Sequence, residues 1–418
     1  MSTLDSQQHW AERRRYELDW LRVVAFALLI LYHVGMAYVA DWGWHIKSAY
    51  QSEALQPLML WSNQWRMPLL FMISGAAISY QLHRDNGVGF LMASARKLLF
   101  PLTFGSLVIV APQAYVQSKM AGAIPDMTYL SFWRHYLGFP LGFGDALPPV
   151  YLRFAGSNVI WNHLWYLPYL FVYIAVIWLM YPLLKLKPVV QVANTVARKM
   201  PLAILLIGPV LVFFALGEWL WERFPTTHKL VDDWSNHARY FTVFLLGFAL
   251  VRTTRLWEAI KALRLVSLLL AAGSFTCVLF YRQGGELGQY LPLLQPVEGT
   301  VRGAVWSANS WFWIMAVVGY ACAYLARPSR VMQSANRAVY CYYIMHQSLI
   351  VLAVYWLHDL QLGPVVELLA VISFTVIGCT LSYRLIKNVP YVRQCFGVFA
   401  PRQTQTSSAR PFFERAKS

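Results

Sequence analysis

Four ionisable side chains lie within long apolar stretches of the sequence, namely Arg22, His33, Arg66 and His346. An ionisable group at membrane depth is costly, and such groups are usually functional. Arg22 and His33 are eleven positions apart, about three helical turns, so they share one helix face and lie ~16 Å apart along its axis. We therefore expect them to line a path along the first long helix.

The two histidines are expected at similar depths. His346 lies about ten residues from the predicted cytoplasmic start of its helix, which places it near the level of His33 at ~1.5 Å per residue. Two histidines that face each other there are either an acid/base pair or the axial ligands of a haem. A haem protein of this kind usually has several such pairs, which we do not find. For His33 alone, a structural hydrogen bond to a neighbouring helix is the alternative.

The two arginines each have a structural alternative. Arg22 marks the cytoplasmic membrane edge if it only pairs with Asp19, one turn earlier. Arg66 either binds a phosphate or carboxylate or extends its side chain to the outer interface. Ser74 and Gly75, further along the same helix, permit a close approach of a second helix.

Several common catalytic motifs are absent from the sequence. It contains no G-x-S-x-G elbow, P-loop, H-E-x-x-H or dinucleotide-binding glycine motif. No paired metal-ligand spacing connects the five cysteines, which are Cys277, Cys322, Cys341, Cys379 and Cys395. We therefore expect no disulfide framework, metal site or haem.

The composition is that of a multi-pass membrane protein. Hydrophobic residues make up 58% of the 418 residues and charged residues 13%, whereas charged residues are about a quarter of a soluble domain. A membrane-spanning helix requires roughly 20 apolar residues. We expect an all-α protein with about ten transmembrane helices, near residues 18–40, 57–82, 98–118, 162–184, 201–221, 238–251, 264–281, 303–326, 336–357 and 363–386.

The basic residues predict the orientation in the membrane. With ten spans, one set of alternate segments holds 23 Lys and Arg residues and the other nine. The positive-inside rule places the richer set, with both termini, in the cytoplasm. The net charge of +16 therefore indicates cytoplasmic loops, and we expect no nucleic-acid partner. The first apolar run, 18–40, is too long for the core of a signal peptide.

Three segments follow from these patterns. Residues 1–17 form a cytoplasmic N-terminal segment, residues 18–390 the transmembrane domain, and residues 391–418 a basic cytoplasmic tail that we expect to be disordered. The longest predicted external loop, about 119–161, is rich in Gly, Pro and aromatic residues. Its Trp and Tyr residues suit either an interfacial belt or stacking on sugar rings.

Six motifs in order resemble the membrane-bound acyltransferase family 3, including its subgroup around the glucans biosynthesis protein C. The resemblance covers roughly residues 16–390, and Arg22 and His33 have the family's R-x10-H spacing. The motifs are RRYELDWLRVVAFALLILYH, FMISGAAI, ARKLLFP, HLWYLPYLFVY, YFTVFLLGFAL and YCYYIMHQSLIV.

The resemblance implies a bacterial inner-membrane enzyme that moves an acyl group, acetyl or succinyl, from cytoplasmic acyl-CoA to an extracytoplasmic glycan such as a periplasmic glucan. It makes His33 the catalytic histidine and Arg22 its partner toward the donor. Arg96 and Lys97 occupy the family's basic donor-binding stretch, which has more arginines in relatives. The remaining motif residues are His163 and Trp165 at the outer mouth, and His346 and Gln347 in the late helix.

The chemistry of these residues agrees with acyl transfer. A neutral imidazole either removes the proton from an attacking sugar hydroxyl or carries the acyl group itself. Candidate donors to the oxyanion are Arg66, Ser74 and His346. The expected partners are membrane lipid, acyl-CoA and a saccharide acceptor; the oligomeric state is not indicated. A transporter or exporter of a glycan or lipid is the alternative function, although the inverted repeats typical of transporters are not evident.

Overall fold

The computed structural model of the chain describes residues 15–138 and 160–398. Within these ranges the chain is helical and forms no strand, and one isolated bridge joins Val39 to Ser52. The all-α prediction is confirmed for this part of the chain. Residues 1–14 and 139–159 and the tail beyond residue 398 lie outside the described residues, so much of the predicted outer loop and the predicted disorder of 399–418 are not addressed. Within the described start of the predicted tail, Val392–Cys395 form a short helix.

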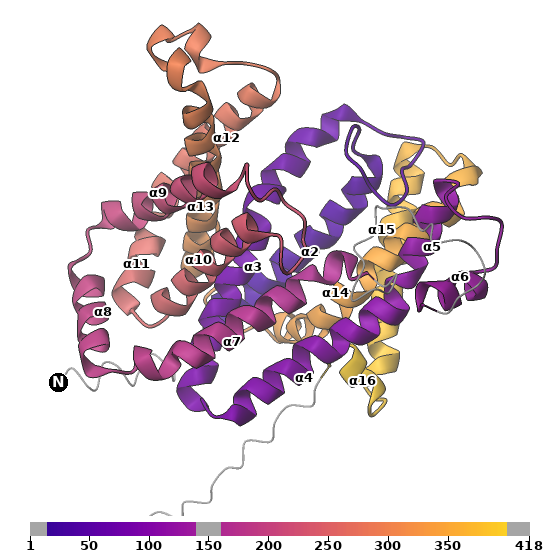
Figure 1. The fold of residues 1–418 in the computed structure, drawn as a ribbon, viewed down its shortest axis with the longest axis horizontal. Helices are drawn as coiled ribbons and strands as arrows, with labels where there is room; N and C mark the ends of the chain where they lie inside the picture. Colours follow the sequence, from indigo (N-terminus) through magenta and orange to yellow (C-terminus); the bar gives the residue numbers. More distant parts are fainter. Residues whose placement is uncertain (1–14, 139–159, 399–418) are drawn as a thin grey trace, which may run out of the picture.

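The helices are arranged as Figure 1 shows. The longer ones are α2 (Tyr16–Tyr38), α3 (Gln56–Arg84), α4 (Val88–Phe104), α5 (Ala111–Met120), α7 (Tyr166–Leu184), α8 (Lys187–Lys199), α9 (Leu202–Leu220), α10 (Trp234–Leu250), α12 (Arg264–Arg282), α13 (Glu298–Tyr324), α14 (Arg330–Leu357) and α15 (Pro364–Ile386). The shorter ones are η1 (Glu53–Leu55), η2 (Gly105–Ile109), α6 (Tyr129–Tyr136), η3 (Asn162–Trp165), α11 (Thr254–Ala262), η4 (Leu287–Gln289), η5 (Pro292–Val297), η6 (His358–Leu360) and α16 (Val392–Cys395).

In the described ranges, seven helical segments are long and apolar enough to cross a membrane. They are Tyr16–Tyr38, Val88–Met120, Asn162–Leu184, Leu202–Leu220, Arg264–Arg282, Arg330–Leu360 and Pro364–Ile386. The other three predicted spans correspond to α3, α10 and α13. Helix α10 has 17 residues, while α3 and α13 are longer but more polar, and polar residues at membrane depth belong to helices enclosed by others.

Helices α2, α3 and α14 carry Arg22, His33, Arg66 and His346, the four ionisable residues found within the apolar stretches of the sequence. Helix α2 contacts α3, α13 and α14, and α14 also contacts α5 and α15. Near the start of α2, the Trp257 indole of α11 donates a hydrogen bond of 3.0 Å to Glu17, which ties α11 to this end of the bundle. Helices α12 and α13 protrude at one edge of the molecule (Figure 1).

Helices α3 and α10 approach each other closely at two glycines. A Cβ atom on Gly75 would lie 1.9 Å from the Phe244 carbonyl oxygen, and one on Gly247 would lie 2.0 Å from that of Met72. No side chain fits at either position, so two backbones meet where the sequence predicted a close helix approach beside Ser74.

Three prolines inside helices leave carbonyl groups that other helices bind. Proline lacks the N–H that would donate to the carbonyl four residues earlier. In lipid an unsatisfied carbonyl costs several kcal/mol. Each of these carbonyls accepts a side-chain hydrogen bond instead. The Gln64 carbonyl, four residues before Pro68, accepts from Arg239 at 2.9 Å and from Ser310 at 2.8 Å. The Lys97 carbonyl, four residues before Pro101, accepts from Tyr340 at 3.1 Å, and the Leu205 carbonyl, four residues before Pro209, accepts from Trp311 at 3.2 Å.

Candidate active site

Two histidines contact each other directly between α2 and α14. His33 Nδ1 and His346 Nε2 are 2.8 Å apart, and the two rings are stacked with their centroids 5.0 Å apart. His346 is fully buried, whereas His33 is half-buried. The expected pairing is therefore present. Because the nitrogen atoms touch, this arrangement leaves no room for an iron ion between them and favours the acid/base alternative over axial haem ligation.

The backbone of α14 fixes the tautomers of this pair. His346 Nδ1 lies 2.7 Å from the Tyr343 carbonyl oxygen and 3.1 Å from that of Tyr342, and a carbonyl only accepts hydrogen bonds. The proton of neutral His346 is therefore on Nδ1, so its Nε2 accepts a hydrogen bond from the Nδ1–H of His33. His33 Nε2 is left with a free lone pair, as a general base requires.

The segment between α2 and α3 covers His33. The Trp44 ring stacks on the His33 ring, with centroids 5.4 Å apart and an interplanar angle of 18°. Lys47 Nζ holds the segment down by donating to the carbonyl oxygen of Met36 at 2.8 Å and to that of Val39. A cation is favourable at these carbonyls because they end α2, where the helix dipole is negative.

A network of amide side chains continues from the covering segment. His45 Nδ1 donates to Gln117 Oε1 at 2.6 Å. The Gln347 amide nitrogen donates to His45 Nε2 at 2.8 Å and to Gln113 Oε1 at 3.0 Å. Burial lowers the pKa of His45 to about 4, so its imidazole is neutral at pH 7 and acts as both donor and acceptor.

A π-helical turn directs α5 toward this network. The turn is η2, and two of its carbonyl oxygens accept hydrogen bonds from side chains. The Tyr136 hydroxyl donates to the Ser106 carbonyl at 2.9 Å, and the Trp133 indole donates to the Leu107 carbonyl at 2.8 Å. Such single turns are frequent at functional sites because they rotate the helix that follows. Here that helix carries Gln113, whose Oε1 accepts the hydrogen bond from Gln347 of α14.

Two buried acceptor atoms in this region receive no hydrogen bond from the described residues. His163 Nε2 donates to the Ile344 carbonyl oxygen at 3.1 Å, so its Nδ1 is an acceptor, and nothing donates to it. The Gln347 Oε1 atom is in the same position. The His163 ring meets the His346 ring edge-on, with centroids 5.1 Å apart.

Arg66 is buried beside the histidine pair, with 2% of its surface exposed. Its guanidinium lies over the ring of Tyr32, 3.8 Å from the centroid, and donates to Ser62 Oγ at 3.4 Å. Among the described residues, no carboxylate forms an ion pair with it. The guanidinium is therefore enclosed by the protein, which disfavours the alternative in which Arg66 extends to the outer interface.

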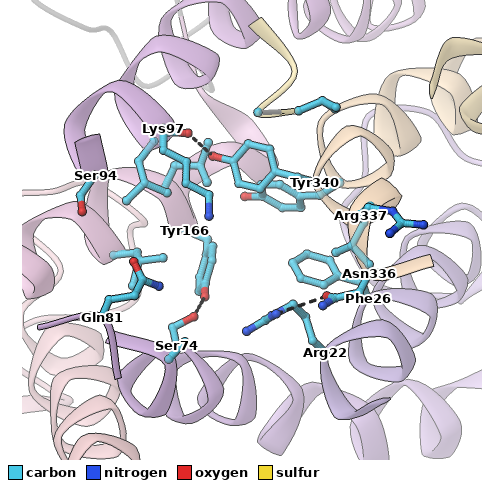
Figure 2. A pocket seen from close by; sticks show the side chains of 18 of the residues that line it. Arg22, Phe26, Ser74, Gln81, Ser94, Lys97, Tyr166, Asn336, Arg337 and Tyr340 are labelled. Atoms are coloured by element: carbon cyan, nitrogen blue, oxygen red, sulfur yellow. Dashed lines mark hydrogen bonds between the residues drawn. The ribbon is translucent and has the colours of Figure 1, made fainter. Parts of the chain in front are cut away.

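A large cavity, with a volume of about 900 Å³, is lined by the parts of α2 and α14 that precede His33 and His346, including Phe26 and Tyr343. Figure 2 shows this cavity from close by. Arg22 and Lys97 extend into it from different walls. The basic residues that line it are Arg22, Arg84, Lys97, Arg337, Lys387 and Arg393. Asp19 is the one acidic residue among the described lining residues. The cavity is therefore strongly cationic and suits a ligand with several negative charges.

Arg22 is held by two neighbours. Its guanidinium lies 3.7 Å from Asp19 Oδ1 and donates to Asn336 Oδ1 at 3.2 Å, while the Asn336 amide donates to Asp19 at 2.8 Å. The pairing with Asp19 considered from the sequence is thus present. Because Arg22 also lines the cavity, these contacts hold its guanidinium at the cavity wall.

The structure brings some of the predicted site residues together and separates others. Ser74 lies in the cavity, where its hydroxyl is 2.6 Å from that of Tyr166. His163 and Gln347 lie around His346, as described above. Arg96 is outside the cavity and donates to Gln394. Trp165 belongs to a separate aromatic cluster, where it packs on His228 and Tyr240.

Sequence reasoning missed three residues of the site. Trp44 and His45 follow the first span in the pattern W-G-W-H, and a histidine just beyond a span that carries His33 was the available signal. Gln113 lies in the apolar stretch 98–118, which the sequence predicts as a span, and no motif marks it.

A family model described as an acyltransferase domain matches residues 15–384. This chain belongs to the acyltransferase-3 family. No curated protein and no solved structure matches the chain. As a member of the family it is an enzyme that transfers acyl groups other than aminoacyl groups, and the hydrophobic helices make it a multi-pass membrane acyltransferase.

Proposed function

We propose that this acyltransferase moves an acyl group from cytoplasmic acyl-CoA to a hydroxyl of an extracytoplasmic saccharide, with His33 as the general base. One observation carries the proposal: His346 Nδ1 lies against backbone carbonyl groups and its Nε2 against His33 Nδ1, which leaves His33 Nε2 as a free base. The corresponding topology is ten spans in the bacterial inner membrane, with both termini in the cytoplasm.

The cationic cavity supports acyl-CoA as the donor. The phosphates of coenzyme A match its Arg and Lys residues. The inner end of the cavity is formed by Phe26 and Tyr343, and Tyr343 is one helical turn before His346. A thioester carried inward from bound phosphates would therefore approach the histidine pair.

The two unpartnered acceptors support an acceptor substrate with hydroxyl groups. His163 Nδ1 and Gln347 Oε1 can only accept hydrogen bonds, and a ligand must supply the donors. Neighbouring hydroxyl groups of a sugar do so, whereas a carboxylate or phosphate would not. The resemblance to the glucan subgroup favours a periplasmic glucan as the acceptor.

In the proposed step, His33 Nε2 takes the proton of the attacking hydroxyl while its oxygen bonds to the thioester carbonyl carbon. The resulting oxyanion is stabilised by a fixed cation, for which the buried Arg66 is suited. The carbon–sulfur bond then breaks, and the departing thiolate takes the proton from His33. The alternative, in which His33 carries the acyl group, uses the same lone pair.

The proposed acyl group is acetyl or succinyl, and Arg66 separates the two. A succinyl chain ends in a carboxylate, which would pair with the buried guanidinium. We expect Arg66→Ala to lower succinyl transfer more than acetyl transfer if Arg66 binds the acyl carboxylate, and to lower both equally if it acts only on the oxyanion. Mass spectrometry of the product glycan measures both ratios.

The proposal is tested in cells that lack the gene. Wild type, His33→Ala and the lipid-facing control Val24→Ala are expressed at matched membrane abundance, and periplasmic and surface glycans are analysed by mass spectrometry. We expect a defined acyl mass increment with wild type and Val24→Ala and none with His33→Ala. Unmodified glycan in every strain, with a change only in its amount or location, would contradict the proposal.

A further inference from the structure

A second, apolar cavity adjoins the cationic one. It has a volume of about 340 Å³ and lies between α2, α14 and α15. Its lining is Val23, Phe26, Ala27, Ile30, Leu31, Val34, Ala335, Ala338, Val339, Tyr342, Ile372, Thr375, Val376 and Cys379. It extends to the outside of the bundle, where Leu31 is 51% and Val376 is 47% exposed.

The polar groups of this apolar cavity are satisfied within the protein. Thr375 donates to the Val371 carbonyl at 2.7 Å, and the Tyr342 hydroxyl is 2.7 Å from that of Thr380. The lining therefore offers a ligand only apolar contact, and the fitting occupant is a hydrocarbon chain.

Two side chains, Phe26 and Val339, line both cavities. Phe26 is 8% exposed, and its ring meets that of Tyr343 edge-on with centroids 5.4 Å apart. Because Tyr343 is one turn before His346, the Phe26 ring stands where the cationic cavity, the apolar cavity and the approach to the histidine pair meet. Figure 2 shows Phe26 at the edge of the cationic cavity, above Arg22.

We propose that Phe26 determines the length of the acyl chain by closing the cationic cavity off from the apolar one. The inference rests on the proposed acyl-CoA donor. With Phe26 in place, an acyl group at the histidine pair is limited to a few carbon atoms. Without the ring the two cavities join, and the methylene groups of a longer chain enter the apolar cavity while the thioester remains near His33.

The size of the effect follows from methylene burial. Each methylene moved from water into an apolar site contributes about fourfold in binding, which corresponds to ~0.8 kcal/mol. Hexanoyl has four methylenes more than acetyl, so the upper limit of the gain is about 250-fold. Because Phe26→Ala also leaves a cavity that loosens the thioester, we expect the hexanoyl-to-acetyl ratio to rise by at least about tenfold.

The experiment measures transfer from acetyl-CoA and from hexanoyl-CoA in membrane vesicles. The acceptor is the total periplasmic and surface glycan extract of a strain without the gene, and products are quantified by mass spectrometry. Phe26→Ala and the milder Phe26→Leu are compared with wild type, and Leu31→Ala serves as a control that lines only the apolar cavity. We expect wild type and Leu31→Ala to prefer acetyl, and both Phe26 variants to gain hexanoyl transfer, Phe26→Ala more.

A filling substitution provides a second test. Ala338 lines the apolar cavity but not the cationic one, so Ala338→Leu in the Phe26→Ala background should remove the hexanoyl gain and leave acetyl transfer unchanged. Two results would overturn this inference but not the proposed donor. In one, wild type is active and has the same hexanoyl-to-acetyl ratio as both Phe26 variants; in the other, wild type already transfers hexanoyl as well as acetyl. A wild type that transfers neither of these groups, nor succinyl from succinyl-CoA, would overturn the proposed donor and the inference together. A wild type that transfers succinyl but not acetyl is compared with the variants by its hexanoyl-to-succinyl ratio.

Discussion

The two sides of the histidine pair differ in the hydrogen bonds that they leave for a ligand. The cavity that contains Arg22 and Lys97 offers cationic donors. The His163 and Gln347 side chains, in contrast, offer unpartnered acceptor atoms. A ligand rich in phosphate is therefore favoured on one side, and a ligand rich in hydroxyl groups on the other. In the proposed function, this division distinguishes the donor from the acceptor by charge before either contacts the reacting atoms.

The largest expected effect concerns the boundary between the two sides. Replacing His33 by Ala removes the proposed general base, and general-base catalysis contributes about 10²–10⁴-fold. We expect turnover to fall by that amount while the affinity for either substrate changes little. Initial rates at saturating donor and acceptor, with protein abundance matched, measure the loss. A His33→Ala enzyme with normal turnover would show that the pair only joins α2 to α14.

In the proposed mechanism His346 acts on the reaction through His33, so its removal should have the next largest effect. In His346→Ala the His33 ring loses the acceptor that fixes its tautomer, and we expect turnover to fall about 10²-fold with an unchanged KM for the donor. The dependence of turnover on pH distinguishes a role in positioning His33 from a role in folding. If His346 positions His33, the pH at which turnover falls on the acidic side should also shift in His346→Ala. An unchanged profile together with reduced protein abundance would indicate a structural role instead.

The cationic side is tested by two neighbouring residues. Lys97 lines the cavity and Arg96 does not. Loss of one charged contact to phosphate is worth about 1.5–3 kcal/mol, so Lys97→Ala should raise the KM for acyl-CoA at least about tenfold. Arg96→Ala is the matched control and should have little effect. Equal effects of the two substitutions would indicate a general surface charge effect rather than a donor site.

A substitution at His163 should affect the KM for the saccharide acceptor and not that for acyl-CoA, which is the reverse of Lys97→Ala, and the effect should be smaller. His163→Phe keeps an aromatic ring but removes the free acceptor atom, Nδ1. We expect the KM for the saccharide acceptor to rise about fivefold to tenfold, in line with one hydrogen bond at ~1 kcal/mol, while the KM for acyl-CoA is unchanged. A rise in the donor KM instead would place His163 on the other side of the boundary.

The last prediction concerns stability rather than rate, and its effect on activity at pH 7 is the smallest. Burial lowers the pKa of His45 from 6.5 to about 4, so between these values the unfolded chain binds more protons than the folded one. Stability is then fully present above pH 6.5 and declines as the pH falls toward 4. We expect the thermal midpoint in detergent to drop over this window, and to drop less in His45→Gln. Equal slopes would show that His45 titrates normally.

The helices and the histidine pair were predictable from the sequence, while much of the surrounding site was not. Apolar periodicity reveals spans, and polar residues inside them reveal depth, which is how His33 and His346 were expected at one level. Depth does not reveal direction. Arg96 and Lys97 are adjacent in sequence, yet only Lys97 faces the cavity, because successive residues of a helix point about 100° apart.

The polar network was hidden for a different reason. Gln113 and Gln117 reach the site through the π-helical turn before α5, and His45 reaches it through a segment fixed by Lys47. Neither feature has a periodic signature in the sequence. Likewise, the burial of Arg66 depends on the enclosure of one end of α3 by other helices, which no single segment encodes.

The carbonyl groups exposed by Pro68, Pro101 and Pro209 have a consequence for how the bundle assembles in the membrane. Apolar helices in lipid slide and exchange neighbours at little cost, because lipid is as apolar as their surfaces. An exposed carbonyl accepts only a donor at one depth and on one partner. Helix α3 is thereby matched to α10 and α13, α4 to α14, and α9 to α13. We therefore expect these prolines to favour one set of helix partners, and one register for each pair, when the bundle assembles in the membrane.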